Sequence, residues 1–168
     1  MEYYRWTFSP SRFLASTVIN RPLINEEGKP TFAQRSLKLK KQDLAVIVAA
    51  GESYGQGSSR EHAALCPMYL GVRAVIAKSI ERIHKANLIN FAIVPIEFDD
   101  PADYDRLSEG SRLFIEDLPD AVRLRDEVEI QIDGGPAFKG RLTLSQRDRQ
   151  ILLAAGLLNY AKKKAMPQ

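Results

Sequence analysis

The sequence has little cysteine and no long apolar run, and both absences narrow the classes of protein that it can encode. Cys66 is the one cysteine among 168 residues, so it cannot form an intramolecular disulfide and cannot alone hold a zinc ion or an iron–sulfur cluster. No stretch approaches the roughly 18 apolar residues that a membrane helix needs. The start, MEYYRWTFSPSRF, has an arginine and polar residues where a signal peptide carries its apolar segment. We therefore expect a cytoplasmic protein that does not enter a membrane.

A strong charge of either sign is also missing. The formal net charge is +3 and the pI is near 9.0, and the basic residues are scattered except for Lys38, Lys40 and Lys41 and the run at 162–164. Such runs are usually solvated faces and only sometimes contacts to nucleic acid. Nucleic acid is therefore not the partner that we expect.

The length and composition fit one soluble domain covering residues 1–168. With 45% hydrophobic residues, the chain can bury a single core without disulfides or metals. Pro10, Pro22 and the turn-like NEEGKP at 25–30 leave an apolar run at 15–19 between them. This pattern predicts an entry strand followed by an irregular loop.

Strand-like and helix-like segments alternate in the middle of the chain. The pattern predicts a buried strand at 43–50, a helix at 60–70 that stops at Gly71, a strand at 72–79, a helix at 80–91 and a strand at 92–98. These segments form two consecutive strand–helix–strand units, which indicates an α/β fold.

Beyond Pro101 the pattern changes to short alternating runs. Residues 111–118, 121–133 and 137–144 predict antiparallel strands, the last two joined by a hairpin. The end of the chain, from Ser145 to Ala161, predicts one amphipathic helix with Ser145 as its cap.

The segment GESYGQGSSREHAAL, residues 51–65, predicts an anion-binding turn. Its glycines at 51, 55 and 57 allow positive φ angles and let a ligand approach main-chain N–H groups. The free N–H groups at the start of the following helix favour negative charge. Arg60 adds a planar fork that grips a carboxylate, although a phosphate suits it as well.

Local pattern alone leaves other interpretations of these residues open. Ser58 or Ser59 can be a simple N-cap, with Glu61 supplying the reciprocal capping-box contact. His62 can be a surface or packing residue or can pair with a neighbouring carboxylate, and the structural interpretation is the better one for His84. The glycine spacing fits neither the dinucleotide-binding fingerprint nor the P-loop. The residue spacing by itself therefore predicts an anion site and does not identify the anion.

As a whole, residues 51–98, from GESYGQGSSREHAAL to INFAIVPIEF, closely resemble the swivel, or C-terminal, domain of aconitase and the small subunits of isopropylmalate and homoaconitate dehydratases. The ending ILLAAGLLNYAKKK looks like the tail of the same domain, whereas the first forty residues match weakly. The Ala-Ala-Leu and Arg-Ile-His pieces favour aconitase. The resemblance implies a swivelling β/β/α fold and a cluster-bearing large subunit or domain as partner. This chain lacks the three cysteines that the partner's [4Fe–4S] cluster needs, and it is expected to bind no metal itself.

The resemblance also implies an activity and roles for individual residues. The activity is that of a hydro-lyase isomerising the tricarboxylates citrate and isocitrate through cis-aconitate. Ser58 matches the serine base, and Ser59 and Arg60 match the residues that bind a substrate carboxylate. A further arginine recognises a distal carboxylate, for which Arg21 is the candidate with Arg12 behind it. The isolated chain is expected to be inactive.

Two departures from the family pattern keep other functions open. Ser53 stands where the family usually has asparagine, a mild change. Tyr4, Arg5, Trp6 and Thr7 stand where it has an aspartate-rich segment, so an orienting carboxylate is missing. The chain is then a fragment with a replaced start or a divergent paralogue with altered or lost activity. The alternatives are an isopropylmalate or homoaconitate dehydratase small subunit and a non-catalytic paralogue, including an RNA-binding module that uses the lysines at 38–41.

Overall fold

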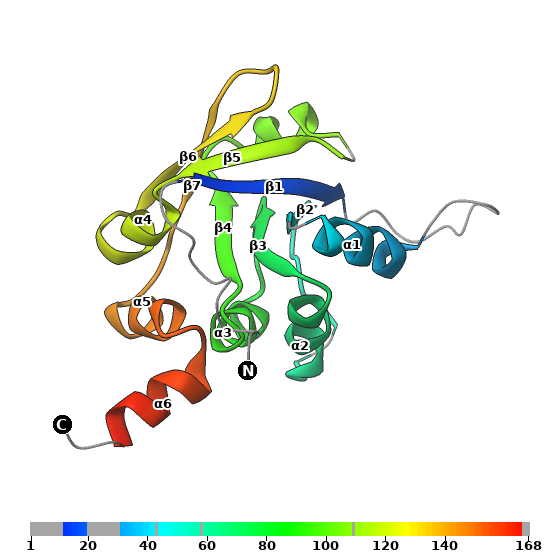
Figure 1. Ribbon diagram of the computed structural model, residues 1–168. Helices are drawn as coiled ribbons and strands as arrows, with labels where there is room; N and C mark the ends of the chain where they lie inside the picture. The colour runs from blue at the N-terminus through cyan, green and yellow to red at the C-terminus, as the bar shows by residue number, and fades with distance from the viewer. Residues whose placement is uncertain (1–11, 20–30, 43, 58, 109, 166–168) are drawn as a thin grey trace.

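The computed structural model describes residues 12–19, 31–42, 44–57, 59–108 and 110–165. In this part of the chain, seven strands close into a barrel with helices around it (Figure 1). The strands are β1 (Arg12–Ile19), β2 (Ala45–Ala50), β3 (Val72–Ala77), β4 (Val94–Phe98), β5 (Arg112–Glu116), β6 (Glu127–Ile132) and β7 (Phe138–Arg141). The assignment of all 168 residues to one domain stays a prediction.

The barrel has a parallel half and an antiparallel half. The strand order is β1-β2-β3-β4-β7-β6-β5, and β5 pairs with β1 to close the ring. Strands β1 to β4 run parallel, whereas β4–β7, β7–β6, β6–β5 and β5–β1 are antiparallel. The α/β fold expected from the alternating segments is therefore present, and the change of pattern beyond Pro101 marks the change from parallel to antiparallel pairing.

Helices connect the parallel strands and flank the barrel. They are α1 (Phe32–Lys41), α2 (His62–Tyr69), α3 (Arg82–Asn90), the 3₁₀ helix η1 (Pro101–Arg106), α4 (Leu118–Leu124), α5 (Gln146–Leu153) and α6 (Leu157–Ala165). Figure 1 shows α2 and α3 side by side beneath β3 and β4, with α4 to α6 on another side. None of the described helices has the length and apolar character that crossing a bilayer requires.

Alternate residues of the parallel strands supply two separate cores. In β2, Ile47 and Ala49 point into the barrel, where they join Ile76 and Phe98. Val46, Val48 and Ala50 belong instead to the cluster that packs under α2 and α3. Because both faces of these strands are buried, their sequences are nearly continuous apolar runs. This is why the segments at 43–50, 72–79 and 92–98 could be recognised as strands.

Two expectations about the elements were wrong, and one helix was not predicted. Helix α1, which was not predicted from the sequence, follows the region predicted as an irregular loop. Residues 121–124, predicted as the start of the strand at 121–133, belong instead to helix α4. The single C-terminal helix is instead two helices, because Ala155 and Gly156 take φ angles of 62° and 107°. Ser145 does cap α5, accepting from the N–H of Asp148.

Candidate functional site

The glycine-rich segment lies where two parallel strands end. Residues 51–61 lead from β2 to α2, and residues 78–81 lead from the neighbouring strand β3 to α3. In α/β folds, ligands bind outside the carboxyl ends of such strands. The segment and the start of α3 therefore share the edge of the sheet at which a site is expected.

Ser79 holds the first half of the segment. The Ser53 N–H donates to Ser79 Oγ at 2.7 Å, and this hydroxyl donates in turn to Glu52 Oε2 at 2.7 Å. The Tyr54 N–H donates to the Ser79 carbonyl at 3.0 Å, and the Glu81 N–H donates to the Tyr54 carbonyl at 2.9 Å. These bonds extend the pairing of β2 and β3 beyond the ends of the strands, so the turn has a defined backbone path.

Gly55 packs directly on the ring of His84 from helix α3. The glycine has a φ of +92°, and a Cβ added to it would lie 2.2 Å from His84 Cγ. The His84 ring also meets the Tyr54 ring edge-on, with 5.1 Å between the centroids. Burial lowers the pKa of His84 and raises the pKa of Tyr54, so both side chains are neutral at neutral pH. Only glycine fits at position 55.

Asn87 holds the second half of the segment from the same helix. Its Nδ2 donates to the Ser59 carbonyl at 3.0 Å, and the residue is 7% exposed. Residues three apart on a helix share a face, so His84 and Asn87 together contact the turn at Gly55 and Ser59. Sequence reasoning missed Asn87. The available signal was a polar residue on the buried face of the helix predicted at 80–91.

A hollow of about 380 Å³ lies between the turn and the first turn of α3. We call it the turn–helix hollow. It is lined by Gly55, Gln56, Gly57, Ser59, Glu81, Arg82, Ile83 and His84. His84 is the one buried residue of this set, and it therefore forms the floor of the hollow.

The structure places only part of the predicted site set. Ser59 and Arg60 are exposed residues just before α2, and Ser59 lines the hollow. Ser58 and Arg21 lie outside the described residues, and Arg12 is the first residue of β1. The catalytic and binding roles given to these residues stay predictions.

The interpretation of a serine-capped helix was wrong. Helix α2 begins at His62 and has Glu61 as its N-cap, which makes no side-chain cap hydrogen bond. Ser59 is therefore not the N-cap of α2 and takes no part in a capping box. The backbone of Ser59 is held from α3 instead.

This chain does not offer the ligands of an iron–sulfur cluster. Cys66, the one cysteine of the sequence, is exposed on α2, and the described residues contain no group of three or more His, Cys, Asp or Glu side chains able to hold a metal ion. Clusters of this kind are held by several cysteine thiolates. The residues of this chain therefore do not fit an iron–sulfur cluster.

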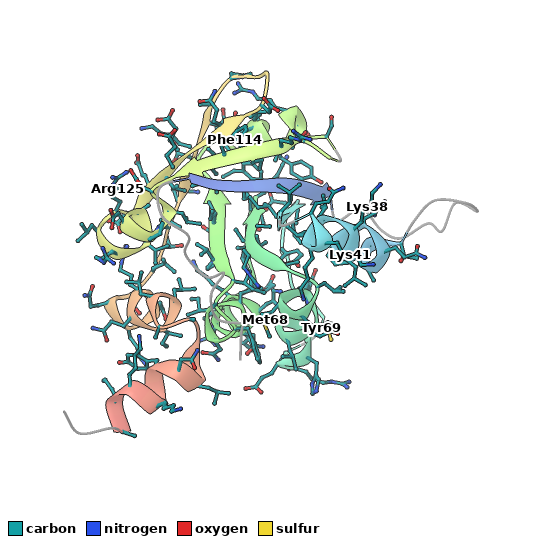
Figure 2. The ribbon with its side chains drawn as sticks, in the orientation of Figure 1. Lys38, Lys41, Met68, Tyr69, Phe114 and Arg125 are labelled. Atoms are coloured by element: carbon teal, nitrogen blue, oxygen red, sulfur yellow. The ribbon has the colours of Figure 1, made fainter. Side chains whose placement is uncertain are left out.

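The basic residues of α1 belong to the end of that helix. Lys38, Lys40 and Lys41 lie in its last turn, where positive charge interacts favourably with the helix dipole. Lys38 and Lys41, which are labelled on α1 in Figure 2, are both exposed. Lys40 instead contacts α2, because its Nζ donates to the Tyr69 carbonyl at 2.7 Å and lies 4.9 Å from the Tyr69 ring centroid.

A barrel of this kind is also found in a crystal structure of 3-isopropylmalate dehydratase from Methanocaldococcus jannaschii. The two chains superpose with a TM-score of 0.64 at 27% identity, over 91% of this chain and 95% of that one. The fold is thus that of the swivel-type domains of aconitase and isopropylmalate dehydratase, as the sequence resemblance implies.

The model of the family "Aconitase C-terminal domain" matches residues 18–101, half of the sequence. The chain belongs to this family. A putative mitochondrial aconitate hydratase from Emericella nidulans is 36% identical over 83% of this chain and 18% of its own length. A probable mitochondrial aconitate hydratase from Dictyostelium discoideum is 38% identical over 88% of this chain and 19% of its own length. The chain spans less than a fifth of these curated relatives.

Proposed function

We propose that this chain is the swivel domain or small subunit of an aconitase-like hydro-lyase. The proposed reaction interconverts citrate and isocitrate through cis-aconitate, and a partner domain or large subunit holds the [4Fe–4S] cluster. The observation that carries the proposal is the turn at 51–60, placed at the end of β2 and anchored through Ser79 and Asn87, in a chain of the aconitase C-terminal family. The expected cytoplasmic location is part of the proposal, and cell fractionation tests it.

The chemistry that we propose for this chain is proton removal and carboxylate binding. Ser58 takes a proton from the carbon next to a carboxylate, and Ser59 and Arg60 bind a carboxylate of the substrate. Arg60 is exposed and presents a planar fork that matches two carboxylate oxygens. Arg21 is proposed for a distal carboxylate. The starts of α2 and α3 at the same edge favour a bound anion and stabilise a serine alkoxide.

Reconstitution tests the proposal. The chain is mixed anaerobically with a cluster-loaded aconitase-like large subunit from the same cell, and cis-aconitate is followed by its ultraviolet absorbance. Turnover is expected in the mixture only, because the chain alone lacks cluster ligands. Turnover by iron-free chain would contradict the assignment of the cluster to a partner. A stable complex without turnover would identify a paralogue that binds but does not catalyse.

Neighbouring serines provide a matched comparison. Ser58→Ala is expected to abolish turnover in the mixture, whereas Ser59→Ala is expected mainly to raise KM, because the first change removes the base and the second removes a binding contact. Both variants should keep the melting temperature of the parent chain. If Ser58→Ala retained activity, the base assignment would be wrong.

A second candidate is the small subunit of an isopropylmalate dehydratase, which the likeness to the Methanocaldococcus structure favours. The same mixture supplied with isopropylmalate in place of citrate distinguishes the two. An RNA-binding module is less favoured, because Lys40 is engaged with Tyr69. Filter binding at increasing salt tests that alternative, since phosphate contacts weaken as salt rises.

A further inference from the structure

The first turn of α3 lines the turn–helix hollow. The first N–H groups of a helix have no partner inside it, and the first helical residues Arg82, Ile83 and His84 all line the hollow. The N-cap residue Glu81 makes no side-chain cap hydrogen bond, and the first turn of this nine-residue helix contains no acidic residue. The helix therefore presents partial positive charge to the hollow.

His84 gives a second and independent indication of a ligand. The residue is 4% exposed and forms the floor of the hollow, and its Nδ1 and Nε2 atoms are buried without a hydrogen-bond partner in the described structure. Buried polar groups in proteins are nearly always paired. A neutral imidazole has one N–H to donate, so this residue of the hollow's lining has a donor that no described group uses.

The charged side chains around the hollow are few. Among the residues that line it, Glu81, Arg82 and His84 are the ionisable ones. Lys85, in the next position, bonds to Glu97 and Thr143 instead. An anion in the hollow would therefore be attracted by Arg82 and repelled by Glu81.

We propose that the turn–helix hollow is a second carboxylate subsite. One carboxylate of a di- or tricarboxylate accepts hydrogen bonds from the first-turn N–H groups of α3 and from the His84 ring, while Ser59 and Arg60 hold another. The inference rests on the proposed function and adds the α3 side of the site to it. The volume of about 380 Å³ is in the range of small-molecule sites.

The two histidines of the sequence make the test direct. The side-chain nitrogen signals of His62 and His84 are the full histidine set of the chain, and a His84→Phe variant assigns them. The chain of residues 1–168 is titrated at fixed pH and ionic strength with tricarballylate, a tricarboxylate without the reactive hydroxyl. The His84 signals are expected to shift saturably, whereas acetate and sulfate at the same ionic strength give less than a tenth of that shift.

Two charge variants locate the ligand. Glu81→Gln removes the repelling carboxylate and is expected to tighten tricarballylate binding by roughly two- to five-fold, and Arg82→Gln is expected to weaken it by a similar factor. Arg147→Gln, an exposed arginine of α5, is the matched control and should leave the affinity unchanged.

The result that overturns the subsite differs from the result that overturns the proposed function. A His84 signal unmoved by tricarballylate, an equal response to sulfate, or an affinity unchanged in both charge variants overturns the subsite, even if the mixture turns over. A saturable His84 shift in a chain that never supports turnover establishes the subsite and removes the proposed reaction.

Discussion

At the scale of single residues, two polar side chains of α3 determine the shape of the candidate site. His84 lies beneath Gly55, and Asn87 bonds to the Ser59 carbonyl. No sequence motif predicts either contact, because the two residues in each pair are far apart along the chain. Ser59 and Asn87, for example, are 28 positions apart. The turn is thus positioned by a helix that contributes no predicted catalytic group.

Replacing Asn87 should separate positioning from stability. Asn87→Leu removes the amide that holds the Ser59 carbonyl, and we expect turnover in the reconstituted mixture to fall by ten-fold or more, because small displacements of catalytic groups are costly. Stability should fall by about 1–2 kcal/mol. Asn159→Leu is the control, because Asn159 makes an equivalent bond to the Ala155 carbonyl at 3.0 Å on α6. Equal turnover in the two variants would argue against a positioning role.

Two glycines of the turn separate backbone strain from packing. Both have positive φ, +92° at Gly55 and +114° at Gly57, but an added Cβ meets His84 only at Gly55. Gly57→Ala should cost about 1–2 kcal/mol of stability through its φ, and Gly55→Ala about 1–3 kcal/mol more through the clash. Urea unfolding of both variants measures the difference. Equal losses would mean that His84 does not support the turn.

At the scale of elements, a buried arginine joins the two helices that flank the antiparallel strands. Arg149 of α5 is 7% exposed. Its Nη1 donates to the Val122 carbonyl at 2.8 Å and the Arg125 carbonyl at 2.7 Å, and its Nη2 pairs with Asp126 at 2.6 Å. The last carbonyls of α4, which have no partner inside that helix, are satisfied in this way.

Replacing this arginine should loosen α4 from α5. Arg149→Met is expected to lower the free energy of unfolding by about 2–3 kcal/mol, because it leaves carbonyls of the α4 end without a donor. Arg149→Lys should lose less, since it keeps a donor but not the fork. Arg147→Met on the exposed side of α5 should change stability by under roughly 0.5 kcal/mol. Similar losses for positions 147 and 149 in urea titrations would contradict this role.

The elements also show where sequence patterns were sufficient. The parallel strands and α2 and α3 were recognisable because both faces of the strands are buried and their apolar runs are bounded by glycine and charge. Helix α1 was missed because lysine and other polar residues make up most of it, although Thr31 and Gln34 form a capping box. The break between α5 and α6 was missed because it involves a tertiary contact between Gly156 and the end of α3. A Cβ there would lie 2.8 Å from the Asn90 carbonyl oxygen.

At the scale of the whole molecule, burial of one histidine links global stability to pH. Desolvation lowers the pKa of His84 in the folded chain below the unfolded value of 6.5. Just below pH 6.5, the unfolded chain therefore binds a proton at this residue that the folded chain does not bind. Stability from this group is complete above pH 6.5 and is lost as pH falls toward the lower pKa of the folded state.

Variants of the two histidines isolate the contribution of His84 to the pH dependence of stability. The melting temperature of the parent chain is expected to fall between about pH 7 and pH 5, and His84→Phe should reduce the slope because phenylalanine keeps the packing but binds no proton. His62→Gln, at an exposed position of α2, should leave the slope unchanged. A slope that is the same in the parent and in His84→Phe would show that other groups control the dependence.

The sequence by itself determined the alternation of strands and helices and the family, and it predicts that the turn at 51–60 binds an anion. All three depend on residues that are close along the chain, where glycine, apolar runs and helix starts act locally. Only the tertiary structure decided that β5 closes the barrel against β1, that Ser79 and Asn87 hold the turn, and that His84 forms the floor of a hollow. These features join residues 26 or more positions apart. Such contacts depend on how the barrel packs its helices, which no local pattern encodes.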